Sequence, residues 1–298
     1  MKTCAAWIVL LMYLLCSCKN INIEDNYKSQ YLTLEFKCSK VNNKTVEEVD
    51  SKAPYFPYGF KTAIYIFNSQ TFWPHIAGSP IVATSYGGSD LIPDKEILLP
   101  KGVYDIYCVS ENSPAISFLN IYHGIASGLV NGKDYLWAKR EGVLLLKNEQ
   151  VNLLFKHIAS RLLVTVSTEE SNSSILVNSF RITLPEAAAN TLNLGDGTIS
   201  PSAYTEQLST IEGYGNTREI LLLPCLAKLN FEFDAQVLTE GSSPVIRTFF
   251  GEINQQLIAG NSYELSIKIK SDLAIKIEVR GYPTNIVDNH IIFKSINN

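Results

Sequence analysis

The residues that could carry out chemistry are dispersed, and their spacing does not assemble a reaction centre. No histidine has a metal-ligating residue two to four positions further along, so no zinc site is indicated. His123 and Ser127 are the nearest approach to part of a catalytic triad, but no nucleophile elbow or phosphate-binding glycine loop is present. Asp196 supplies one carboxylate where a calcium loop needs several oxygen ligands. We therefore predict no catalytic residue, no metal site and no cofactor. The histidines are His75, His123, His157 and His290.

Cys18 is the cysteine with a predicted chemical role. An apolar run from Ala5 to Leu15, too short to span a bilayer, leads into Leu-Cys-Ser-Cys at 15 to 18. This resembles a bacterial lipobox, whose cysteine receives a diacylglyceryl group before the signal is removed. We expect residues 1–17 to be a lipoprotein signal peptide, Cys18 to be lipidated and residues 18–30 to form a polar tether. An ordinary secretory signal cut nearby is the alternative.

Three other cysteines follow the signal, namely Cys38, Cys108 and Cys225. Three cannot all pair with one another. Cys38 and Cys108 lie on strand-like segments of the same half of the chain and could meet. Buried thiols that pack as small hydrophobic groups are the simpler prediction.

Composition indicates an exported β protein rather than a nucleic-acid binder. The 298 residues are 46% hydrophobic and 18% charged, which suits a globular chain, and the net charge of −4 offers no basic field for nucleic acid. Val, Ile and Thr recur in short runs, with 15 Tyr and 13 Phe, and no long amphipathic helix is apparent. Many short strands broken by Gly, Pro and Asn predict an all-β protein with two sandwiches.

The first predicted strand is Y-L-T-L-E-F-K-C (31 to 38), in which alternate apolar residues face the core. We expect a long irregular segment, 41 to 58, to follow it, either as a functional loop where proteases can cut or as a connector with no role. Further along, 96 to 110 predicts a β-hairpin, and 192 to 200 predicts a turn between two short strands. The clearest amphipathic strand is 274 to 279.

The stretch from Val151 to Val166 organises the chain. Its apolar residues fall at odd positions up to Phe155 and at even positions from Leu162, so the alternation slips by one residue. One strand would need a bulge there, whereas a change of sheet explains the slip directly. We therefore predict a seam between two β domains, 31–157 and 158–298, with His157 satisfying backbone groups at it.

Five motifs in order behind the lipobox resemble the fimbrillin-like lipoproteins of Bacteroidales. They span about half of the chain, and family members typically show an Asp-x-Leu, a Phe-x-His step, a short turn strand and a Gly-x-x-Tyr ending. The motifs are D-Y-L-W-A (134 to 138), V-N-L-L-F-K-H-I-A-S-R-L-L-V-T-V (151 to 166), L-N-L-G-D-G-T-I-S (192 to 200), L-L-P (222 to 224) and L-I-A-G-N-S-Y-E-L-S-I-K-I (257 to 269).

The resemblance implies two tandem transthyretin-like β-sandwich domains. It also implies a structural, tip or accessory subunit of type V pili that contributes to adhesion as an outer-membrane lipoprotein at the cell surface or in a fimbrium. The expected partners are other fimbrial subunits, the outer membrane through the lipid anchor, and host or bacterial surface ligands.

In the pilin branch of that family, a protease cuts after the first strand and a neighbour's strand fills the vacated groove. Arginine-specific cleavage does not fit this chain, because its first arginine is Arg140. The tail after residue 282 is rich in apolar residues. It is a candidate donor strand, or a last strand of its own sheet. The candidate leaving strand contains Tyr31, Leu32, Leu34, Phe36 and Cys38, the candidate cleavage residues are Lys40, Lys44 and Lys52, and the candidate donor residues are Ile286, Ile291 and Phe293.

The alternative hypothesis is a glycan-binding surface lipoprotein of a polysaccharide-use system. Trp73 and Trp137 could stack on sugar rings, although aromatic residues in a β-rich chain are more often part of the core.

Overall fold

Every regular element that the structure describes is a β-strand, which confirms the all-β prediction. The computed structural model describes residues 31–40, 56–70, 79–185, 191–200, 208–224, 229–253, 256–270 and 272–282. No helix in this part of the chain has the length and apolar character needed to cross a membrane. The predicted signal, Cys18, the tether, Lys44, Lys52, Trp73, Cys225 and the candidate donor strand lie outside the described residues.

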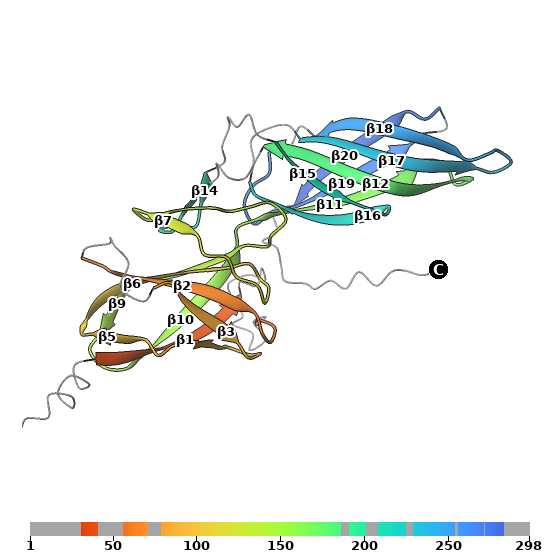
Figure 1. Ribbon diagram of the computed structural model, residues 1–298. Helices are drawn as coiled ribbons and strands as arrows, with labels where there is room; N and C mark the ends of the chain where they lie inside the picture. Colours follow the sequence, from red (N-terminus) through yellow and green to blue (C-terminus); the bar gives the residue numbers. More distant parts are fainter. Residues whose placement is uncertain are drawn as a thin grey trace, which may run out of the picture.

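The first half of the chain forms one large sheet that closes on itself (Figure 1). Its order is β10-β9-β6-β2-β3-β4-β1-β5, and β1 also pairs with β10, so the first and seventh strands of that order meet. Its strands are β1 (Tyr31–Lys40), β2 (Lys61–Asn68), β3 (Ile81–Ser85), β4 (Asp90–Pro93), β5 (Leu98–Pro100), β6 (Gly102–Ser110), β9 (Leu136–Leu145) and β10 (Glu149–His157).

The closed sheet encloses one hydrophobic core. Ile64 and Ile66 of β2, Ile106 of β6 and Leu153 and Phe155 of β10 are almost completely buried in one common cluster. Every second side chain of these strands therefore points into the enclosed core, as the period of a strand requires. The two strands predicted at 96 to 110 are present as β5 and β6, but the predicted hairpin between them is wrong. β5 pairs with β1, whereas β6 pairs with β2 and β9, so the turn at residue 101 carries the chain to another place in the sheet.

The second half is a sandwich of two four-stranded sheets, β16-β11-β19-β20 and β15-β12-β17-β18. One buried cluster takes side chains from both sheets, including Leu162 and Val164 of β11 and Phe231 and Phe233 of β17. Its strands are β11 (Ser160–Thr168), β12 (Ser173–Pro185), β15 (Leu208–Gly213), β16 (Thr217–Leu222), β17 (Leu229–Thr239), β18 (Val245–Ile253), β19 (Ser262–Ile269) and β20 (Ile275–Tyr282).

The predicted change of sheet between Val151 and Val166 is confirmed. Phe155 is buried in the first core and Leu162 in the second, and only Ile158 and Ala159 separate β10 from β11. The slip in the alternation therefore marks a change of core and needs no bulge.

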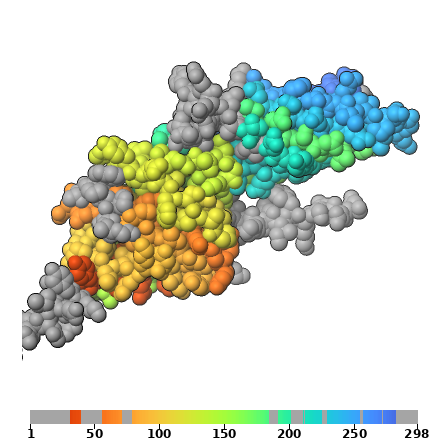
Figure 2. Space-filling model, viewed as in Figure 1, coloured from red at the N-terminus to blue at the C-terminus, as the bar shows by residue number. Residues whose placement is uncertain are grey.

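A fourth sheet, made of short strands, joins the two halves. Its order is β14-β13-β8-β7, and β13 pairs with β8 through Leu192 opposite Ala126 and Asn193 opposite Ile125. Its strands are β7 (Asn120–Tyr122), β8 (Ile125–Ser127), β13 (Thr191–Asn193) and β14 (Ile199–Ser200). The predicted turn between two short strands at 192 to 200 is present as β13 and β14. These strands share a sheet with β7 and β8 of the first half, a pairing that the local sequence did not indicate. The space-filling view shows the segment around β7 and β8, in yellow, lying between the orange body and the cyan and blue one (Figure 2).

Candidate strand-exchange site

The strand β1 is held along both of its edges. On one side it runs parallel to β10, from Leu34 opposite Glu149 to Lys40 opposite Phe155. On the other side it pairs antiparallel with β5 through residues 31–33 and with β4 through residues 36 and 37. β1 is therefore the strand that completes the closed sheet.

The side chains of β1 alternate as predicted. Leu34, Phe36 and Cys38 are at most 5% exposed and belong to the first core, and Leu32 packs against that core while partly buried. Tyr31 is 40% exposed. Burying one Leu or Phe side chain contributes about 1.5 to 3 kcal/mol, so β1 supplies several kcal/mol to the first core.

Polar contacts fix the register of β1. The Thr33 N–H donates to Asn148 Oδ1 at 3.1 Å, and the Cys38 N–H donates to the Ser89 carbonyl at 2.6 Å. Lys37 forms an exposed ion pair with Asp90. The hydrogen bond to Asp90 raises the pKa of the Lys37 ammonium above its usual value. Because that ion pair is exposed, it contributes more to the alignment of β1 with β4 than to the stability of the fold.

An open cleft of about 410 Å³ lies beside the end of β1. It is lined by Lys37, Cys38 and Ser39 of β1, by Ser89, and by residues of β10 from Gln150 to Leu154. Lys40, a predicted cleavage residue, is the last residue of β1. A cut there would leave β1 attached to the rest of the chain by noncovalent contacts alone.

The two described cysteines of this core are buried thiols, as the sequence predicted. Burial raises the pKa of the Cys108 thiol well above its usual value, because a thiolate is poorly solvated in an apolar core. Cys38 and Cys108 therefore serve as packing residues of the first core.

His157 and Asp134 come together at the seam. His157 Nδ1 lies 2.7 Å from Asp134 Oδ1, and Asn112 Nδ2 donates to Asp134 Oδ2 at 2.8 Å. Asp134 is a side-chain partner that the sequence interpretation of His157 did not name. Asp134 and His157 each belong to a motif that carried the family resemblance. That shared membership was the one signal in the sequence that could have indicated their contact.

The remaining candidate residues have structural contacts. His123 has a positive φ of 48° and packs edge-to-face against Tyr122, with ring centroids 4.3 Å apart. The Ser127 hydroxyl donates to the Asn120 carbonyl. Within the described residues, no group of three or more His, Cys, Asp or Glu side chains is placed to hold a metal ion.

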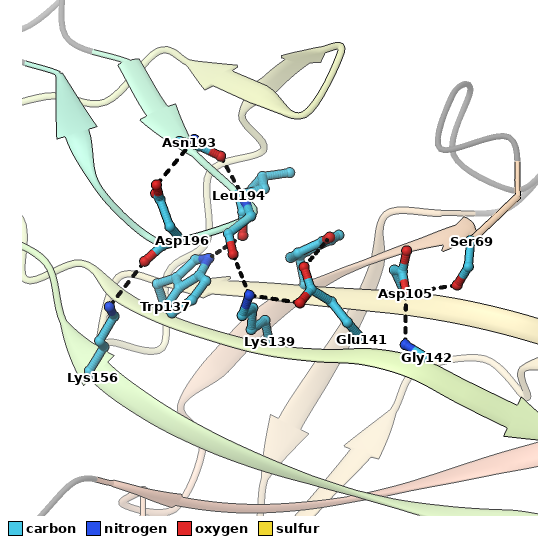
Figure 3. A network of polar contacts seen from close by, with 12 residues as sticks. Ser69, Asp105, Trp137, Lys139, Glu141, Gly142, Lys156, Asn193, Leu194 and Asp196 are labelled. Carbon is cyan, nitrogen blue, oxygen red and sulfur yellow. Dashed lines mark hydrogen bonds and ion pairs between the residues drawn. The ribbon is translucent and has the colours of Figure 1, made fainter.

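Trp137 is part of a polar network that docks the 194–197 turn onto β9 (Figure 3). Its Nε1–H donates to the Leu194 carbonyl at 3.1 Å, and Lys139 Nζ donates to the Gly195 carbonyl at 2.5 Å. At Gly197, which has a φ of 72°, an added Cβ would lie 2.6 Å from the indole ring. Trp137 is only 5% exposed, so its ring is covered by protein and cannot stack on a sugar.

Comparisons with known proteins agree with this architecture. Residues 81–280 match the sequence profile of a family described as fimbrillin-like. A candidate cell adhesion protein of Bacteroides uniformis superposes with a TM-score of 0.57 at 14% identity, over 85% of this chain and 98% of that one. Another from Bacteroides ovatus superposes with a TM-score of 0.54 at 16% identity, over 84% of this chain and 96% of that one. A third, from Bacteroides fragilis, has a TM-score of 0.52 at 14% identity, over 86% and 100% of the two chains. No curated protein sequence matches the chain.

Proposed function

Because this chain belongs to the fimbrillin-like family, we propose that it is a structural, tip or accessory subunit of type V pili that contributes to adhesion. Under this proposal Cys18 anchors the precursor in the outer membrane, and the mature protein works at the cell surface or in the fimbrium. Its partners are neighbouring fimbrial subunits, and its role is structural rather than enzymatic. Residues 31–157 and 158–298 then act as two tandem transthyretin-like domains.

The placement of β1 carries the proposal. β1 comes from the start of the described chain, yet it fills a slot between β10 on one side and β4 and β5 on the other. If β1 leaves, two strand edges lose their hydrogen-bond partners and the pockets of Leu34, Phe36 and Cys38 open. A strand from another subunit with the same alternation of apolar residues would pair with the open edges and fill the open pockets.

The lysine-containing segment after β1 provides the release step. A cut after Lys40, Lys44 or Lys52 separates β1 from β2, and the tail with Ile286, Ile291 and Phe293 supplies a strand to the next subunit. Under this proposal, the lysines after β1 serve to free the strand that closes the sheet.

Limited trypsin digestion of the full chain, purified in detergent, tests the proposal. We expect a cut between Lys40 and Lys52, loss of the β1 peptide by mass spectrometry, and oligomers that survive mild denaturant. The variant with Lys40, Lys44 and Lys52 replaced by Gln should stay intact and monomeric. A matched variant with the exposed Lys95, Lys101 and Lys147 replaced by Gln should behave as the wild type.

Complete release of β1 without any oligomer at high protein concentration would reject strand exchange between copies. Family membership and the fold would remain as described.

A further inference from the structure

A cavity of about 360 Å³ lies where the two halves of the molecule meet. One wall is the end of β10 with Lys156 and His157, followed by Ile158. The opposite walls are the 197–199 segment and the 256–260 segment that leads into β19. The cavity is separate from the β1 slot, and its volume is at the lower end of the range for small-molecule sites.

The charge of the lining is positive in an otherwise acidic protein. None of the twelve residues that line the cavity is Asp or Glu, whereas one of them, Lys156, is a lysine. The whole chain carries a net charge of −4. A cavity with these properties attracts anions.

The ammonium group of Lys156 is satisfied by neutral groups. Its Nζ donates to the Asp196 carbonyl at 3.1 Å and lies 4.5 Å from the centroid of the Trp137 ring (Figure 3). Within the described residues, no carboxylate forms an ion pair with Lys156. Burial lowers the pKa of Lys156, which is the cost of holding a charge out of water.

The nearest carboxylate, that of Asp196, is turned to its own loop. It accepts hydrogen bonds from the Thr198 N–H at 2.8 Å and the Thr198 hydroxyl at 2.6 Å, and Asn193 Nδ2 donates to it at 3.3 Å. Its hydrogen bonds with Thr198 lower the pKa of Asp196, so the carboxylate is ionised and already paired at neutral pH. The carboxylate is therefore held by Thr198 at the edge of the cavity, where its charge partly offsets the lowering of the Lys156 pKa by burial, while the Asp196 carbonyl accepts from Lys156.

The rest of the lining is largely aliphatic. Ile158 and Leu257 are 1% exposed and Ile199 is 8% exposed, and Pro224 and Ile258 add further apolar surface. Thr198 and Gln256 are the other polar side chains on the lining. The cavity combines one cation with a small hydrocarbon surface.

We propose that this cavity is a binding site for a small monocarboxylate with a compact apolar body. The carboxylate pairs with Lys156, and the hydrocarbon part packs against Ile158, Ile199 and Leu257. Since these residues come from β10, the shared sheet and the segment before β19, a bound ligand contacts both halves and stabilises their junction. This site is independent of strand exchange.

Isothermal titration with saturated monocarboxylates of four to eight carbons, and with the neutral amides of the same chains, tests the site on the full chain. We expect the acids to bind and the amides to bind at least tenfold more weakly, which corresponds to about 1.4 kcal/mol. Binding should also raise the thermal midpoint, because only the folded junction holds the ligand.

Variants assign the binding to this cavity. Lys156→Met should lose at least tenfold in affinity, and Lys156→Arg should retain it. Ala259→Leu keeps the ammonium but fills part of the space, so it should also weaken binding. Lys147→Met removes an exposed lysine outside the cavity and should leave affinity unchanged.

Equal binding of acids and amides, or unchanged affinity in both Lys156→Met and Ala259→Leu, would overturn the proposal. The same holds if no acid of the series binds at 10 mM, about the weakest affinity that one ion pair and a small apolar contact would give.

Discussion

The strands β1 and β11 open the two halves of the molecule, and they occupy equivalent places in their sheets. β1 runs parallel to β10 and has antiparallel neighbours on its other edge, and β11 runs parallel to β19 with antiparallel β16 on its other edge. Both strands bury alternate apolar side chains in the core of their half. Pairing and burial alone therefore do not distinguish them.

The difference lies in how the chain holds each strand. β11 follows β10 after two residues and leads into β12 after a short turn. β1 ends at Lys40 and β2 begins at residue 61, and the residues between them include the proposed cleavage residues Lys44 and Lys52. The comparison teaches that, if β1 is exchanged as proposed, its covalent attachment and not weak packing sets it apart from β11.

The largest expected effect comes from cutting the chain next to each strand. With a site-specific protease sequence placed between residues 41 and 52, cleavage should allow β1 to dissociate in mild denaturant. A cut in the turn between β11 and β12, at residues 170–172, should leave β11 in place because it continues directly from β10. Size-exclusion chromatography and mass spectrometry measure both outcomes. The comparison fails if β1 stays bound until the second core unfolds.

Leu34→Ala and Leu162→Ala form a matched pair in the two cores. Both leucines are at most 5% exposed, so each substitution should lower the free energy of unfolding by about 2 to 5 kcal/mol. After β1 has been released, the Leu34→Ala effect on the remaining chain should vanish and the Leu162→Ala effect should persist. Chemical denaturation before and after cleavage gives the two values. A persistent Leu34→Ala effect would contradict the release of β1.

Gly197→Ala tests the junction between the halves. The positive φ and the contact with the Trp137 ring should together cost about 2 to 3 kcal/mol. Gly215→Ala is the control, because Gly215 also has a positive φ but an added Cβ there meets no atom within 4 Å, so about 1 kcal/mol is expected. Thermal unfolding and tryptophan fluorescence follow both variants. Equal losses would mean that the contact with Trp137 does not matter.

Asp90→Asn should give the smallest effect. It removes the exposed ion pair between Lys37 and Asp90, and 1 M salt should abolish the difference from the wild type. Since the pKa of Lys37 is raised in the folded protein, the contribution of the pair is complete below pH 10.5 and is lost as the pH rises through the folded pKa. Urea titrations at pH 7 and pH 11 check the sign. A stability difference that grows with pH would contradict it.

Local alternation made much of the fold predictable. The faces of β1 and the change of sheet after His157 follow from a period of two residues, which each short stretch carries by itself. The same period located β5 and β6 but wrongly paired them with each other. Alternation did not predict the slot that β1 fills, because the idea of such a slot came from the family resemblance and the strands beside β1 were not named.

Pairings between distant segments could not be predicted. The sheet shared by β8 and β13, the contact of His157 with Asp134 and the burial of Trp137 under the 194–197 turn depend on register across tens of residues. A single sequence carries no period that fixes such partners. The cavity beside Lys156 was missed for the same reason, since its walls come from three separate segments.

The sheet shared by β8 and β13 has a mechanical consequence. A backbone link at residues 158–159 would by itself act as a swivel, but a second attachment away from it, between Ala126 and Leu192, removes that rotation. The two attachments together hold the halves in one relative orientation. If the chain assembles into the proposed filament, bending is then expected at the contacts between subunits rather than within a subunit.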